Sequence, residues 1–89
     1  MAVQLVSYDL RKPGRNYDEL FEAITKLGKW WHCLDSIWIV KTEKSCAQIR
    51  EQLLTYLDPN DDLVVLGLNG NWATVGLSDE CKTWFKEQL

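Results

Sequence analysis

The segment from Lys29 to Thr42, KWWHCLDSIWIVKT, is the part of the sequence that most constrains the fold. It is rich in aromatic and β-branched residues, which favour strands. It is long for one flat strand, because strands in globular proteins usually span about five or six residues. We therefore expect either a bent strand or two short strands broken near Leu34 and Asp35.

Further strands are expected near both ends of the chain. Residues 3–10, VQLVSYDL, alternate with the period of two that a strand requires, so Leu5 and Asp9 point to one face and Val6 to the other. Asn69-Gly70 lies between LVVLGL and NWATVGL, and this dipeptide predicts a hairpin because both turn positions tolerate positive φ. The sequence thus predicts a strand on each side of that turn.

Three helices are expected between and after the strands. Asn16 with Glu19, and Ser45 with Gln48, have the spacing of a capping box, in which two side chains each satisfy a free backbone N–H group. Apolar residues recur at helical spacing after both boxes. Ser78 is expected to cap a last helix.

These elements predict an α+β fold in one domain, residues 1–89. With the segment 29–42 divided, the order is β-α-β-β-α-β-β-α, which contains the β-α-β-β-α-β plan of ferredoxin-like folds and ends in an extra C-terminal helix. Helices cover one face of such a sheet. Here both faces are apolar, for example Leu66 on one and Val65 on the other. The simplest cover for the second face is another copy of the chain, so a homodimer is expected.

Composition narrows the possible functions. The net charge of −3 argues against non-specific binding of duplex nucleic acid, which normally requires a basic face. The N-terminal residues MAVQLVSYDL have the features of neither a signal peptide nor a membrane span, so no membrane association is expected.

Cysteine usage predicts the compartment. Cys33, Cys46 and Cys81 are odd in number and far apart, with no Cys-x-x-Cys pair and only one histidine, His32. We therefore expect reduced thiols in a cytoplasmic protein, serving as small core residues.

Three stretches together resemble a known family. VSYDL as the first strand, DSIWIV as the central β segment and YLDPNDDLVVLGL as a helix end entering a strand are similar to the small CRISPR-associated adaptation proteins, the second of the Cas proteins. The virulence-associated protein D toxins belong to the same superfamily. The resemblance covers roughly residues 3–77, and its most specific part is the YD pair near the N-terminus. It implies a ferredoxin-like homodimer that acts on RNA or DNA.

The resemblance also implies a role for Asp9. In the family, the aspartate at the end of the first strand approaches its symmetry mate, and it is the proposed ligand of a divalent metal in members that cleave RNA or DNA. Asp9 is the matching residue, so it is the candidate catalytic residue and ligand of Mg or Mn. A hard cation of this kind prefers oxygen ligands. The alternative is a solvated aspartate that caps the following loop.

Three cations follow Asp9 closely in the sequence. Arg11, Lys12 and Arg15 are the candidate nucleic-acid-binding residues, because they can contact phosphate groups beside a metal. The alternative is a solvated loop in which Arg15 pairs with Asp18 or Glu19.

Two other polar or aromatic clusters have a structural and a functional interpretation. Residues 29–32, KWWH, could stack on bases, but adjacent tryptophans at such a junction more often divide between a core and an interface. Asp58, Asp61 and Asp62 form an acidic turn that could bind a cation, although such acids are more often solvated turn formers.

The sequence therefore supports two hypotheses. The first is a Cas-two-like nucleic-acid-associated homodimer that acts as a metal-dependent endoribonuclease centred on Asp9. The second is a non-catalytic adaptor or protein-interaction module with the same fold, because the family contains both kinds and fold alone does not fix chemistry.

Overall fold

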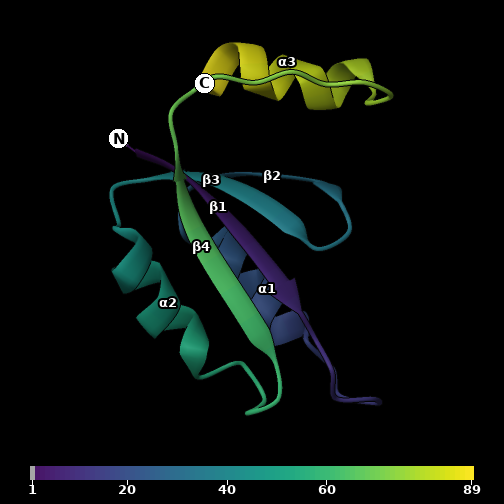
Figure 1. Cartoon of the computed structure of the whole chain (residues 1–89), viewed down its shortest axis with the longest axis vertical. Coiled ribbons are helices and arrows are strands. Elements are labelled where there is room, and N and C mark those ends of the chain that lie inside the picture. Colours follow the sequence, from purple (N-terminus) through teal and green to yellow (C-terminus); the bar gives the residue numbers. More distant parts are fainter. Residues whose placement is uncertain (1) are drawn as a thin grey trace.

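The computed structural model describes residues 2–89 (Figure 1). The elements in chain order are β1 (Ala2–Asp9), α1 (Asp18–Thr25), β2 (Lys29–Leu34), β3 (Ile37–Thr42), α2 (Cys46–Leu54), β4 (Asp62–Leu68) and α3 (Asp79–Gln88). They form a small α+β fold with one four-stranded sheet and three helices. The strand order is β2-β3-β1-β4, and every neighbouring pair is antiparallel.

The Trp-rich segment forms two strands, as one of the two sequence alternatives predicted. β2 and β3 pair with Leu34 opposite Ile37, and the turn between them is Asp35-Ser36. The register shifts between Trp31 and Leu34, so β2 is irregular before the turn.

The hairpin expected at Asn69-Gly70 is not formed, and that prediction is wrong. Gly70 has the positive φ, 84°, that the dipeptide predicted, but residues 71–77 form no strand. Trp72 instead packs against Phe85 of α3, with 5.2 Å between ring centroids. The chain therefore leaves the sheet, and β4 is an edge strand.

Two of the three predicted helix caps are confirmed. The Ser45 hydroxyl accepts from the Gln48 backbone N–H at 3.1 Å, and the Gln48 side chain accepts from the Ser45 N–H at 2.8 Å. Ser78 caps α3 by accepting from the Cys81 N–H at 3.2 Å. Both helices therefore begin at the residue after the capping serine.

The capping box of Asn16 and Glu19 is wrong. α1 begins at Asp18, and its N-cap residue Tyr17 makes no side-chain cap. The Asn16 side chain accepts from the Asp18 N–H at 2.8 Å, so it closes a local turn before the helix. The tyrosine hydroxyl is engaged elsewhere, at Asp61.

The main core lies between the sheet and the helices α1 and α2. Its fully buried side chains come from β1, β3 and both helices: Val6, Leu20, Ile24, Val40, Ile49 and Leu53. Trp38 joins them with 4% exposure.

The second face of the sheet, where the sequence predicts a second copy of the chain, is covered in part by α3. Figure 1 shows α3 at the end of the sheet where β1 begins and β4 ends. Phe85 of α3 packs on Trp31 and Ile39, and all three are buried. Val64 and Leu66 on β4 stay 46% and 50% exposed, so part of this face is still open.

Two cysteines are bonded, which corrects the expectation of reduced thiols. Cys33 of β2 and Cys81 of α3 form a disulfide with a Cα–Cα distance of 6.4 Å, and Cys46 is free. The two residues are 48 positions apart in sequence. Only the packing of α3 against β2 brings the two cysteines together, so their spacing in the sequence could not reveal the disulfide.

Candidate functional site

The end of β1 and the start of β4 place two carboxylates next to each other. Asp9 is the last residue of β1, and the antiparallel register sets it directly opposite Asp62. Arg11 bridges the two: one of its terminal nitrogens lies 2.9 Å from Asp9 Oδ2 and 2.8 Å from Asp62 Oδ2. The acid and the first cation of the loop therefore belong to one cluster.

This cluster is open to solvent. The side chains of Asp9 and Asp62 are each 66% exposed, and that of Arg11 is 54% exposed. The hydrogen bond to Asp9 and the charge of Asp62 raise the pKa of Arg11, so it stays cationic. Exposed ion pairs contribute little to stability, because water and salt screen them. Another cation could replace the guanidinium at low cost.

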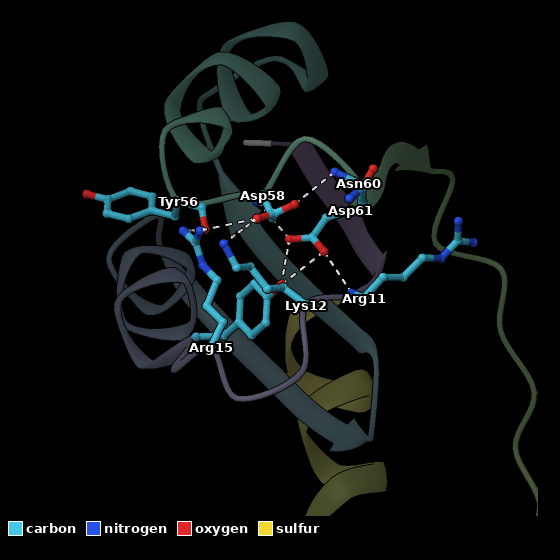
Figure 2. A network of polar contacts seen from close by, with 8 residues as sticks. Arg11, Lys12, Arg15, Tyr56, Asp58, Asn60 and Asp61 are labelled. Atoms are coloured by element: carbon cyan, nitrogen blue, oxygen red, sulfur yellow. Dashed lines mark hydrogen bonds and ion pairs between the residues drawn. The ribbon is translucent and has the colours of Figure 1, made fainter.

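The other two cations of the loop point to a different carboxylate (Figure 2). Lys12 Nζ lies 3.3 Å from Asp58 Oδ2, and a terminal nitrogen of Arg15 lies 3.9 Å from the same oxygen. Arg15 also donates to the Tyr56 carbonyl at 3.0 Å. Asp58 itself is buried. The alternative partners considered for Arg15, Asp18 and Glu19, are not the ones the structure shows.

Asp61 connects the basic loop to the acidic turn. Its carboxylate accepts from the Arg11 N–H at 2.8 Å, the Asp58 N–H at 2.8 Å and the Tyr17 hydroxyl at 2.8 and 3.0 Å. Burial acts to raise the pKa of Asp61, but the hydrogen bonds that its carboxylate accepts, together with the charge of Arg15, outweigh burial, and the pKa lies below its ordinary value. Asp61 is thus a hydrogen-bond acceptor that connects the basic loop to the acidic turn. The sequence suggested only a solvated aspartate in a turn.

Replacing Asp61 with asparagine is expected to lower the free energy of unfolding by about 1–2 kcal/mol at pH 7, since an amide offers one acceptor oxygen in place of two. A lowered folded-state pKa stabilises the fold above the unfolded-state pKa, and this contribution is lost as the pH falls through the folded-state pKa. Urea unfolding at pH 7 and pH 3 should therefore show a smaller difference between wild type and Asp61→Asn at pH 3.

A matched control lies one residue away. Asp62→Asn removes the charge of an exposed carboxylate in the same turn and should change the unfolding free energy by less than about 0.5 kcal/mol. Equal losses in the two variants, or a difference that does not shrink at low pH, would show that Asp61 is not the acceptor that holds the loop.

The structure thus divides the predicted site residues into two groups. Asp9 and Arg11 lie together, whereas Lys12 and Arg15 gather at Asp58. Sequence reasoning did not include Asp62 in the site. A signal for it was present, because the start of a strand that pairs antiparallel with β1 must lie beside the end of β1.

The KWWH segment divides between core and surface. Trp31 is 4% exposed, and Trp30 is 46% exposed. The His32 ring stacks on Trp38 with 3.8 Å between centroids, and His32 Nδ1 lies 3.0 Å from the Ile37 carbonyl oxygen. This histidine is engaged in packing, and only Trp30 presents a largely open aromatic surface.

A shallow depression of about 240 Å³ lies beside the two carboxylates, lined by Ser7, Tyr8, Asp9, Asp62, Leu63 and Val64. Within residues 2–89 there is no group of three or more histidine, cysteine, aspartate or glutamate side chains placed to hold a metal ion. The depression therefore places two carboxylates side by side, those of Asp9 and Asp62.

Comparison with models of known protein families gives no match to this chain, and no solved structure matches it. No helix within residues 2–89 is long and apolar enough to cross a membrane.

Proposed function

We propose that the protein is a Cas-two-like, nucleic-acid-associated domain that cleaves RNA in a metal-dependent reaction at Asp9. The observation that carries this proposal is the pair of opposed carboxylates, Asp9 and Asp62, which share one guanidinium at 2.9 and 2.8 Å. The Arg11 nitrogen lies where both carboxylates can approach one cation.

The donor set suits a hard divalent cation. Asp9 and Asp62 supply carboxylate oxygens, and their exposure leaves room for the several waters that Mg²⁺ retains. Bound Mg or Mn would supply Lewis-acid stabilisation of a phosphate and a water of lowered pKa. A site shared between two copies of the chain would add a second set of the same ligands.

The cations of the loop have a defined role in this proposal. If the two carboxylates held a metal, the Arg11 guanidinium would be free to pair with a phosphate oxygen, for which its fork of donors is suited. Lys12 and Arg15 stay close to Asp58, so their attraction for phosphate is partly neutralised. Arg11 is therefore the principal phosphate contact of the three.

Metal binding tests the carboxylate pair without requiring activity. In a Mn²⁺ titration followed by electron paramagnetic resonance, the wild-type protein should bind Mn²⁺, and Asp9→Asn and Asp62→Asn should each weaken binding about tenfold or more. Asp79→Asn is the control, because its carboxylate is fully exposed on α3. Equal affinity in wild type and Asp9→Asn would remove Asp9 from the metal site.

We also infer that the domain is ferredoxin-like and dimeric. Its order β-α-β-β-α-β, with β1 between β3 and β4, supports the first inference. The exposed side chains of Val64 and Leu66 on the edge strand β4 support the second, because an edge with apolar side chains favours pairing with another chain. The interface would have to bury about 1,000 Å² or more to be specific.

Sedimentation velocity at micromolar concentration should therefore show a dimer of the 10.4 kDa chain. Leu66→Lys should shift the protein to monomer, because it places a charge on the proposed interface, whereas Leu54→Lys on the exposed surface of α2 should not. A wild-type protein that sediments only as a monomer would contradict the dimer.

A non-catalytic adaptor is the second candidate function. The pairing of Lys12 and Arg15 with Asp58 favours it, since these cations already stabilise the fold of the acidic turn. In this case RNA cleavage would be absent, and the open part of the sheet would bind protein. A cytoplasmic location is part of the first proposal, although the Cys33–Cys81 disulfide is more typical of an oxidising compartment.

A further inference from the structure

The C-terminal helix is joined to the sheet by a covalent bond at its start and by a long irregular connection. Residues 69–78, which link β4 to α3, form neither helix nor strand. Cys81, in the first turn of α3, is bonded to Cys33 of β2. Cys33 is exposed, so this disulfide is accessible to a reductant from solvent.

Besides the disulfide, one apolar cluster centred on Phe85, Trp31 and Ile39 holds α3 against the sheet. Phe85 stacks on Trp31 with 4.8 Å between centroids, and the Trp31 indole N–H donates to the Cys81 carbonyl at 3.0 Å. An open groove of about 320 Å³ lies between the sheet and the connection that leads to α3. Its lining is almost wholly apolar and includes Leu5, Trp31, Ile37, Val75 and Phe85.

The length of α3 matters for its behaviour when it is not bonded to β2. A helix of 10 residues is too short to be stable alone in water, so α3 depends on its contacts with the sheet. Apolar contacts with the sheet, centred on Phe85, supply the noncovalent part of this docking. The disulfide is the covalent constraint that keeps α3 at the sheet.

We infer that the Cys33–Cys81 disulfide is a redox-controlled latch that holds α3 as a lid over the second face of the sheet. Reduction opens the latch, and α3 separates from Trp31 and Ile39. This inference is independent of the proposed function, since Asp9 and Asp62 lie at the opposite end of the sheet from α3 (Figure 1).

The chemistry requires a dithiol reductant. One thiolate of the dithiol attacks a sulfur of the protein disulfide and forms a mixed disulfide, releasing one cysteine as a thiol. The second thiol of the reductant then displaces the other cysteine and closes a disulfide within the reductant. Two electrons pass to the protein, and Cys33 and Cys81 both end as thiols.

Hydrogen exchange measured by mass spectrometry on the full-length protein tests the latch. With dithiothreitol, the amides of α3 should exchange at least about tenfold faster than in the oxidised protein, while those of β1 and β3 keep their protection. Cys33→Ser without reductant should reproduce this pattern. Cys46→Ser should keep the latch and its response to dithiothreitol, because Cys46 is free and lies on α2.

Three results would overturn the inference. If α3 keeps its protection after reduction, packing alone holds it. If α3, β1 and β3 lose protection together, the disulfide stabilises the whole fold and there is no separate lid. If thiol titration of the denatured, unreduced protein finds three free thiols, the latch does not form.

Discussion

Replacing Trp38 with alanine is expected to lower the free energy of unfolding by about 3–5 kcal/mol, the range for truncating a buried aromatic side chain. Trp38 is 4% exposed and lies at the centre of an aromatic cluster. The His32 ring stacks on it at 3.8 Å, Phe21 lies at 6.2 Å, and its indole N–H donates to the Tyr8 hydroxyl at 3.0 Å. Alanine would leave a large cavity and remove the donor to Tyr8.

Chemical denaturation followed by circular dichroism measures this loss. Trp30→Ala is the matched control. Trp30 packs against Trp38 with 5.4 Å between ring centroids, but it is 46% exposed. Its truncation should cost about 1 kcal/mol. A loss below about 1 kcal/mol for Trp38→Ala would contradict the burial of its side chain.

The regular elements could be predicted because their signals are local. The Ser45 and Ser78 caps depend on residues within three positions, and both were identified correctly. The division of the Trp-rich segment followed from its length. Such patterns act within one turn or one strand, where the sequence itself holds the information.

Two of the errors arose where tertiary packing decides the outcome. Asn69-Gly70 has turn geometry, but Trp72 packs on Phe85 and draws the chain away from β4. The Cys33–Cys81 disulfide depends on where α3 docks. In both cases a partner distant in the sequence overrides the local preference.

For the candidate site as well, local features could be predicted and distant partners could not. The resemblance identified Asp9, and the loop cations were evident from the sequence. The partners of these residues were not, because they come from the turn before β4. Asp62 lies opposite Asp9 only through strand pairing, and Asp58 neutralises Lys12 only because that turn folds against the basic loop.

Loss of cleavage in Asp9→Asn is the prediction with the largest expected effect on activity. Asparagine is close in size to aspartate and can still accept a hydrogen bond from Arg11, so the fold should persist. It removes the negative charge through which Asp9 would bind a divalent cation. If Asp9 holds the metal, the rate of RNA cleavage with Mn²⁺ should fall about 100-fold or more, since a bound metal lowers the activation barrier by several kcal/mol.

The measurement that tests the proposed function most directly is therefore cleavage of a labelled single-stranded RNA by wild-type protein, Asp9→Asn and the control Asp79→Asn, each with Mn²⁺ and with a chelator. We expect cleavage by wild type and Asp79→Asn in the presence of Mn²⁺, and none by Asp9→Asn or in chelator. If wild type cleaves no RNA, the adaptor function is favoured. If Asp9→Asn keeps full metal-dependent activity, Asp9 is not the catalytic residue and the proposal is wrong.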